Sequence, residues 1–215
     1  MRTLLACLAL AACSSSSALT PTPGAIGFDD AQATSGWRFD STGGNGAHAT
    51  WQAHADAAAV SPGQVMSLVT ASPGSEDRFN LCWRDAPKFR DGRIGVAVRA
   101  DGGAVDQGGG PMWRVQGNGD YYVCRFNPLE SNYRVYVVSK GVRRQLATAL
   151  VEGRVGEWHR LEVEHKGSKI TCWFDGRKLL EADDATIPGE GGVGLWTKAD
   201  ARTSFDDLVV GPHGS

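Results

Sequence analysis

The sequence predicts an all-β fold, a two-sheet antiparallel jelly-roll sandwich in a single domain. No segment after residue 25 keeps a sustained 3.6-residue apolar period, whereas apolar and polar residues alternate with period 2 in many short runs. Glycine supplies 28 of the 215 residues, which indicates many tight turns. Short alternating runs separated by frequent turns are typical of packed antiparallel sheets.

Composition and charge narrow the class of protein. The chain is 41% hydrophobic and 21% charged, which is ordinary for a globular protein and excludes disordered and fibrous classes. A formal net charge of −2 argues against a nucleic-acid partner. No linker or fixed-period repeat divides the chain after residue 25, so we expect one domain over residues 25–212.

The first residues have the layout of a secretory signal. A positive start is followed by an apolar run to Ala12, so residues 1–12 are expected to be a signal peptide. The tetrapeptide Leu10-Ala11-Ala12-Cys13 resembles the bacterial lipobox, which implies lipidation of Cys13; an ordinary cut near Ala12 is the alternative. Residues 13–24 are rich in Ser, Thr and Pro and are expected to form a flexible tether. We therefore expect export and a lipid anchor in the bacterial cell envelope as the one membrane contact, or otherwise a periplasmic or secreted protein.

Fourteen strands are expected along the domain. They are Ala25–Asp30, Thr50–Ala53, Gln64–Thr70, Arg78–Arg84, Arg93–Ala100, Met112–Gln116, Tyr121–Asn127, Tyr133–Ser139, Arg143–Ala149, Trp158–Lys166, Lys169–Phe174, Lys178–Asp183, Gly192–Thr197 and Thr203–Val210. Turn residues such as Gly117-Asn118-Gly119 and Asp175-Gly176 join neighbours as hairpins. Fourteen short strands are too many for one open sheet, so we expect two packed sheets.

Three cysteines, Cys82, Cys124 and Cys172, lie inside apolar strand-like runs. Free, buried thiols are the expected state. One disulfide between neighbouring strands is the alternative, and an odd number leaves at least one thiol unpaired. No spacing of cysteine and histidine indicates zinc.

Alternation within the strands separates a core face from an outer face. In 121–127 the expected core set is Tyr122, Cys124 and Phe126, and in 133–139 it is Tyr133, Val135 and Val137. In 112–116, Arg114 and Gln116 share a face with Met112, whereas Trp113 pairs with Val115.

The outer faces thus carry arginines, amides and rings, which suit sugar hydroxyls and carboxylates. The candidate ligand residues are Trp113, Arg114, Gln116, Tyr121, Arg125, Asn127, Arg134, Tyr136 and Trp196. The alternative is that exposed arginines only solubilise the sheet.

Several runs carry a family resemblance that covers nearly the whole mature chain. They are residues 28–30, 119–130, 132–136, 141–146, 157–163, 174–176, 192–200 and 205–208, with Gly194-Leu195-Trp196-Thr197-Lys198-Ala199-Asp200 the most specific stretch. Together they resemble the concanavalin A-like jelly rolls grouped with the 3-keto-disaccharide hydrolase domains. The resemblance implies the sandwich fold and a carbohydrate or glycoconjugate partner.

The resemblance also implies an activity, the cleavage of 3-oxidised glycosides by elimination and hydration. That chemistry needs a base beside the ketone and donors at the oxyanion. The candidates are Glu130, Lys198 and Asp200 for catalysis and Arg114, Arg125 and Arg134 for the oxyanion. None of them forms a diagnostic spacing, so catalysis stays open. His159 and His165 fall on the apolar face of one strand, where structural histidines are expected.

The sequence argues against two other types of site. Retaining glycosidases of family 16 carry Glu-x-Asp-x-x-Glu, which this sequence lacks, and Glu162-Val163-Glu164 supplies only two carboxylates, so we discount that chemistry. The acidic pairs at the first and last strands make Asp30 and Asp206 weak candidates for a structural Ca²⁺. Polar pairs without metal are the favoured interpretation, and no cofactor is required.

The leading hypothesis is a monomeric, carbohydrate-engaging domain that uses the arginine- and aromatic-bearing sheet. An active 3-keto-glycoside hydrolase or lyase is one alternative, and a non-catalytic structural or protein-interaction sandwich is the other. The leading hypothesis requires a concave cleft lined by Arg114, Arg125, Arg134 and Trp196. The enzyme requires Glu130, Lys198 or Asp200 to converge with the arginines in one pocket. The glycine-rich loop from Asp101 to Pro111 lies beside that expected face and is a candidate lid.

Overall fold

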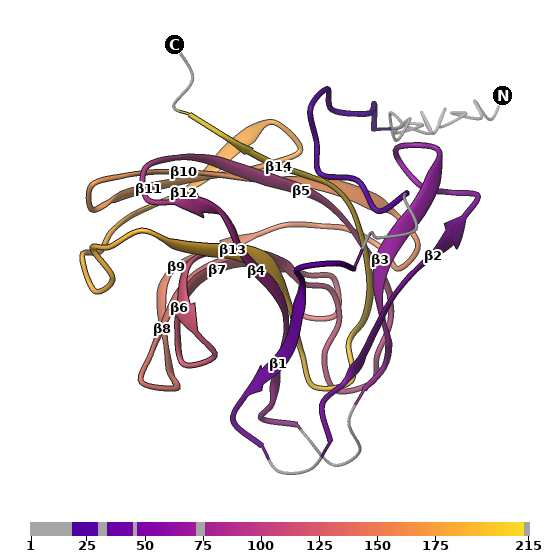
Figure 1. The fold of residues 1–215 in the computed structure, drawn as a ribbon, viewed down its shortest axis with the longest axis horizontal. Coiled ribbons are helices and arrows are strands. Elements are labelled where there is room, and N and C mark those ends of the chain that lie inside the picture. The colour runs from indigo at the N-terminus through magenta and orange to yellow at the C-terminus, as the bar shows by residue number, and fades with distance from the viewer. Residues whose placement is uncertain (1–18, 30–33, 45–46, 72–75, 213–215) are drawn as a thin grey trace, which may run out of the picture.

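A computed structural model describes residues 19–29, 34–44, 47–71 and 76–212. Cys13, Asp30 and the predicted signal peptide lie outside these residues. The described chain is all-β and forms a sandwich of two seven-stranded antiparallel sheets, as the sequence predicted (Figure 1). No helix among the described residues is long and apolar enough to cross a lipid bilayer.

The first sheet has the order β1-β4-β13-β6-β7-β8-β9. Its strands are β1 (Arg38–Thr42), β4 (Phe79–Phe89), β13 (Gly191–Lys198), β6 (Gly110–Gly117), β7 (Asp120–Asn127), β8 (Asn132–Ser139) and β9 (Val142–Leu150). The second sheet has the order β12-β11-β10-β5-β14-β3-β2. Its strands are β12 (Arg177–Asp183), β11 (Lys169–Phe174), β10 (Trp158–Lys166), β5 (Gly92–Gly102), β14 (Arg202–Gly211), β3 (Gly63–Thr70) and β2 (Thr50–Asp56).

Two differences from the predicted strands lie near the N-terminus. Residues 25–29 form only an isolated bridge between Ile26 and Leu208, and the Asp29 carboxylate accepts a hydrogen bond from the backbone of Gln64. Strand β1 was not predicted, because its sequence RFDST has no apolar alternation; it forms by pairing with the edge of β4. The other thirteen predicted strands each overlap an observed one.

The main core lies between the sheets. It includes Tyr122, Cys124 and Phe126 from β7 and Tyr133, Val135 and Val137 from β8, which confirms the predicted faces of both strands. Cys82, Cys124 and Cys172 are free and buried, as expected.

The predicted faces of β6 are wrong. Arg114 has a positive φ of 48°, and the register between β6 and β7 shifts after Trp113. This bulge breaks the period-2 alternation. Trp113 therefore packs in the main core, whereas Val115 falls on the same outer side as Met112.

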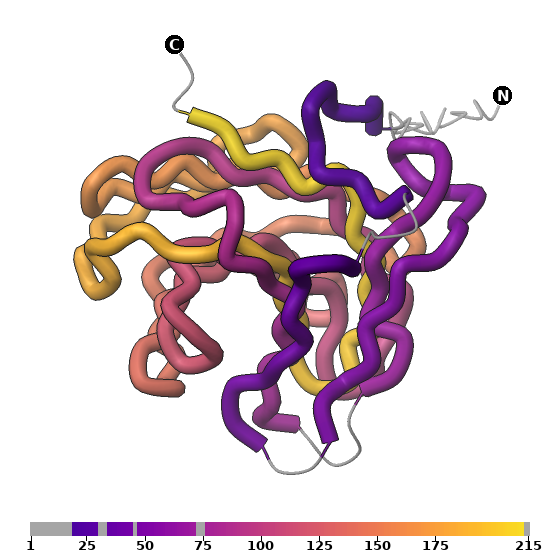
Figure 2. Tube along the Cα trace, viewed as in Figure 1, coloured from indigo at the N-terminus to yellow at the C-terminus, as the bar shows by residue number. Residues whose placement is uncertain are grey.

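The first sheet curls until its outer face becomes concave (Figures 1 and 2). Thr42 on β1 hydrogen-bonds to the Tyr121 hydroxyl of β7 at 2.9 Å and also donates to the carbonyl of Asn118 in the β6–β7 turn. Three strands separate β1 from β7 in the sheet order, so these contacts bridge across the curl. The curl encloses a second apolar cluster on the outer face, here called the concave cluster: Phe79, Leu81, Trp83, Met112, Val115, Tyr121, Val123, Tyr136, Val138 and Trp196.

Candidate functional site on the concave face

An arginine with a half-buried side chain packs against three rings of the concave cluster. The Arg143 guanidinium lies 4.9, 4.5 and 5.9 Å from the ring centroids of Phe79, Tyr136 and Trp196, and no described carboxylate pairs with it. The rings hold the cation through their electron-rich faces. Burial lowers the pKa of Arg143 from its ordinary value. The three rings thus fix a guanidinium without neutralising its charge.

Four buried polar atoms on this face have no partner among the described residues: Trp83 Nε1, Arg125 Nε, Tyr136 Oη and Arg143 Nη1. A buried donor without a partner costs about 1–3 kcal/mol, so such groups are normally satisfied by water or a ligand. Three of the four atoms donate only, and the fourth is a hydroxyl. The concave face therefore offers unused donors to a molecule that carries oxygen acceptors.

A charged network adjoins these atoms at the end of β7. The Arg125 guanidinium contacts Asp106 at 3.2 Å, Glu130 at 2.8 Å and Asn132 at 3.0 Å. Arg134 donates to the same Glu130 oxygen, Oε2, at 3.0 Å, and Lys198 lies 3.6 Å from Asp106. Two carboxylates and three cations are therefore joined in one cluster, which we call the charge network.

The two carboxylates of the charge network have different environments. Burial raises the pKa of Asp106 above its ordinary value, although the charges of Arg125 and Lys198 oppose this. Burial also acts on Glu130, but the hydrogen bond from Asn132 and the charges of Arg125 and Arg134 outweigh it and hold the pKa of Glu130 below its usual value. Every hydrogen bond to the Glu130 carboxylate from described residues goes to Oε2. Its Oε1 is thus left for another partner, on a side chain that is 42% exposed.

Asp200 has a supporting position instead. Its carboxylate accepts hydrogen bonds from the backbone amides of Ala104, Val105 and Asp106 at 2.7–3.0 Å. It therefore anchors the loop that carries Asp106. The same loop has a positive-φ glycine at Gly103, where a Cβ would lie 1.9 Å from the Asp106 carbonyl oxygen. The predicted lid segment is thus fastened beside the charge network by its backbone.

Most predicted site residues meet on the concave face. Tyr121, Arg125, Asn127, Glu130, Arg134, Tyr136, Trp196 and Lys198 all lie in the concave cluster or the charge network. Tyr121 and Trp196 are fully buried, and the indole of Trp196 donates to the Tyr121 hydroxyl at 3.2 Å. These two rings therefore form the floor of the face rather than an exposed stacking platform.

Three predicted ligand residues lie elsewhere. Trp113 stacks on Tyr122 in the main core and donates to His165. Arg114 donates to the carbonyls of Arg90, Ile187 and Gly167, and Gln116 donates to that of Glu190. Arg114 thus lies apart from Arg125, Arg134 and Trp196, which were expected to line one cleft with it.

Sequence reasoning missed Asp106, Arg143 and Trp83. Asp106 lies in the glycine-rich loop, where no alternation indicates which way a side chain points. Arg143 lies on β9, where a register shift between Val135 and Tyr136 of β8 disturbs the pairing. A signal was available for Arg143, because it falls within the run 141–146 that carries the family resemblance.

The sequence also led to predictions for two histidines, His159 and His165, and for a structural metal site. His159 bonds Asp175 and His165 accepts from Trp113, each through Nδ1, so both have the structural setting expected of them. The Asp206 carboxylate accepts from the backbone of Ser61 and Asp207. No group of three or more His, Cys, Asp or Glu side chains in the described ranges could hold a metal ion.

The sequence that forms this site matches one known protein family. Residues 24–210 match the model of the 3-keto-alpha-glucoside-1,2-lyase-like domain. The chain belongs to this family. The sequence matches no curated protein.

Solved structures similar to this lyase-like domain support the fold. The carbohydrate-binding module CBM66 from Bacillus subtilis superimposes with a TM-score of 0.60 at 18% identity, over 80% of this chain and 93% of that one. A Bacillus subtilis protein of unknown function with a galectin-like fold has a TM-score of 0.60 at 13% identity, over 86% and 93%. The cellulose-induced protein Cip1 has a TM-score of 0.59 at 15% identity, over 81% and 90%. At these identities the likeness concerns the sandwich fold alone.

Proposed function

We propose that this domain binds a carbohydrate on the concave face of its first sheet, at the junction of the concave cluster and the charge network. The observation that carries the proposal is the set of four buried polar atoms without protein partners. Sugars present many oxygen acceptors and an apolar ring face, which complement donors set among aromatic rings. Family membership and the carbohydrate-binding module of similar fold favour the same class of ligand.

Removal of one oxygen atom tests the proposal. Tyr136→Phe deletes an unpartnered hydroxyl, and we expect it to weaken binding of a methyl glucoside or its 3-keto derivative by about tenfold in calorimetry. Tyr133→Phe is the matched control, because that hydroxyl donates to the Trp173 carbonyl between the sheets. Equal binding by both variants and the native protein would place the ligand elsewhere.

The second candidate function is cleavage of a 3-keto-glycoside by elimination. Glu130 and Asp106 share Arg125, and their pKa values are displaced in opposite directions. Carboxylates separated in this way suit a base and an acid in one reaction. Ionised Glu130 would take the proton beside the ketone, Arg134 or Lys198 would stabilise the enolate oxygen, and the alcohol would leave with a proton from an acid. Water would then add across the double bond and restore the keto sugar.

Turnover distinguishes the two functions. The purified domain incubated with a 3-keto-glucoside would release the free alcohol if it is an enzyme, and Glu130→Gln would reduce the rate by at least about a hundredfold while binding persists. No turnover with intact binding would leave the domain a binder. The export and lipid anchor expected from the sequence remain proposals for the mature chain.

A further inference from the structure

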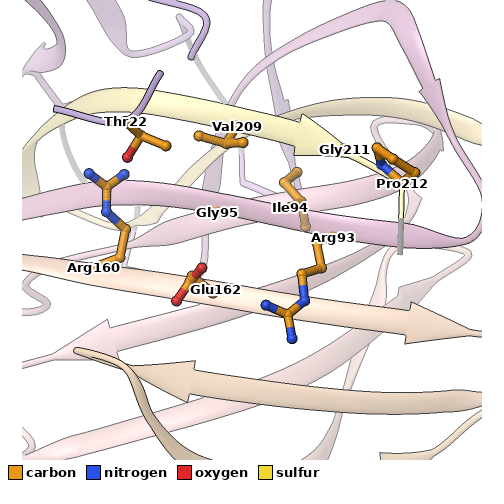
Figure 3. Close-up of a pocket in the computed structure, with 9 residues that line it drawn as sticks. All are labelled: Thr22, Arg93, Ile94, Gly95, Arg160, Glu162, Val209, Gly211 and Pro212. Carbon is orange, nitrogen blue, oxygen red and sulfur yellow. The ribbon is translucent and has the colours of Figure 1, made fainter. Parts of the chain in front are cut away.

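A pocket of about 290 Å³ lies on the opposite side of the molecule, on the outer face of the second sheet (Figure 3). It exists because Gly95 has no side chain. Gly95 on β5 pairs with Glu162 on β10 and with Val209 on β14, so it leaves a gap in a row of outward side chains. A Cβ at Gly95 would lie 3.2 Å from Cγ of Glu162. Gly95 thus forms the floor of a depression between β10 and β14, which carry the side chains of Glu162 and Val209 on either side.

One wall of the pocket is built by the N-terminal segment. The backbone amide of Thr22 donates to the Asp207 carboxylate at 2.8 Å, and Ile26 bridges to Leu208. Asp207 has a positive φ of 48° at a register shift in β14, and it also pairs with Arg160 at 3.3 Å. The Asp207 carboxylate at this bulge therefore binds both the N-terminal segment, through Thr22, and Arg160.

The polar groups of the pocket are unevenly satisfied. Arg93 donates through Nε to Glu164 at 2.9 Å and lies over Trp173 at 4.7 Å, which leaves its two terminal nitrogens without a described partner. Arg160 uses its terminal nitrogens on Asp207, which leaves Nε. Glu162 has no hydrogen bond or ion pair with any described residue, and Figure 3 shows its carboxylate between the two arginines.

We infer that this pocket is a second carbohydrate site, which takes one neutral pyranoside ring. Neighbouring hydroxyls on a sugar both donate and accept, so one can donate to Glu162 while the next accepts from Arg93 or Arg160. The apolar side chains of Val209 and Pro212 line the pocket for the ring's C–H face. An anionic ligand would be repelled by the unpaired Glu162, and a cationic ligand by the flanking arginines. The volume is at the lower end of ligand pockets and suits a single ring.

Two indole N–H signals in ¹H–¹⁵N spectra report separately on the two faces. Trp173 pairs with Glu162 in the β10–β11 register and lies under Arg93, whereas Trp83 lies in the concave cluster. Titration of the protein with a panel of methyl pyranosides should shift the Trp173 signal in a saturable manner. Glu162→Gln should weaken that response about tenfold, whereas Arg134→Ala on the other face should leave it unchanged.

Two further variants separate a lost ligand contact from general damage. Gly95→Ala keeps every charge but crowds Glu162, and it should also weaken the Trp173 response. Glu152→Gln removes an equal charge at an exposed loop position and should have no effect. A Trp173 signal that no sugar moves, or that moves equally in Glu162→Gln, overturns the inference. If Trp83 alone responds, the concave-face function stands and the second site fails; if Trp173 alone responds, the reverse holds.

Discussion

Particular buried rings in the two apolar clusters differ in how their polar atoms are satisfied. Between the sheets, Tyr133 donates to the Trp173 carbonyl, Trp113 donates to His165 and Tyr122 donates to Asp184. On the concave side, the Tyr136 hydroxyl and the Trp83 indole have no partner among the described residues. The indoles of Trp37 and Trp51 in the main core also lack a partner among the described residues. The difference therefore concerns these particular rings, and it lies in their hydrogen bonding and not in their burial.

What distinguishes the concave cluster is that its unpartnered donors lie beside charged side chains. A core that only holds sheets together loses stability with every unsatisfied donor. The concave cluster nevertheless retains several such donors beside the Arg143 guanidinium and the charge network. These unsatisfied donors support the proposal that a ligand binds on the concave face.

Loss of a buried charge should produce the largest effect. Arg125→Met leaves Asp106 with Lys198, at 3.6 Å, as its only neighbouring cation among the described residues, and we expect a loss of about 3–5 kcal/mol in the free energy of unfolding. Arg143→Met is the matched comparison, because that guanidinium has no carboxylate partner among described residues and should cost about 1 kcal/mol. Urea denaturation of both variants measures the difference. Equal losses would mean that the charge network does not depend on Arg125.

Acid should destabilise the protein through the cluster between the sheets. Burial, with the nearby charge of Arg114, lowers the pKa of His165 from 6.5 to about 4. Between these values the unfolded chain binds the proton and the native chain does not, so stability falls as pH drops from about 6.5 to 4. The full difference corresponds to about 3 kcal/mol. Urea denaturation at pH 7 and pH 4.5 should show this loss.

His165→Gln isolates that contribution, because glutamine can still accept from Trp113 but does not titrate in this range. We expect its stability to change less between the two pH values than that of the native protein. An identical change in both proteins would assign the acid sensitivity to other groups.

The matched tyrosines should show smaller effects of opposite sign. Tyr133→Phe breaks a hydrogen bond at 2.9 Å and should destabilise the protein by about 1 kcal/mol. Tyr136→Phe removes a buried hydroxyl without a protein partner and should leave stability unchanged or raise it by up to about 1 kcal/mol. Thermal unfolding of the pair without ligand is the measurement. A clear loss in Tyr136→Phe would reveal a partner for that hydroxyl and remove one donor from the candidate site.

The fold could be predicted because its signals are local. Alternation in β7 and β8 and turn residues such as Asp175-Gly176 each indicate structure within a few residues. Prediction failed where a long-range effect decides the outcome. Strand β1 forms by pairing with β4, and the faces of β6 depend on the bulge at Arg114.

The candidate site was predictable only in part for the same reason. Arg125, Arg134 and Tyr136 follow from alternation in single strands, and the structure places all three on the concave face. Asp106 reaches Arg125 from a loop, which no period describes. The burial of Trp196 depends on the curl of the whole sheet, and that curl is set by contacts such as Thr42 to Tyr121.

The smallest stability effect is expected at the rim of the charge network, where it tests function most cleanly. Arg134 and Glu130 have side chains that are 31% and 42% exposed, and pairs of this kind contribute about 0–1 kcal/mol. Arg134→Ala should therefore leave the unfolding midpoint nearly unchanged, as should Lys169→Ala, which breaks an exposed ion pair with Asp183 on the other sheet. Only Arg134→Ala should weaken sugar binding in calorimetry, because its guanidinium lies beside the free oxygen of Glu130. Sugar affinity equal in both variants would show that the rim of the network makes no contact with the ligand, and would move the site toward Arg143 and its rings.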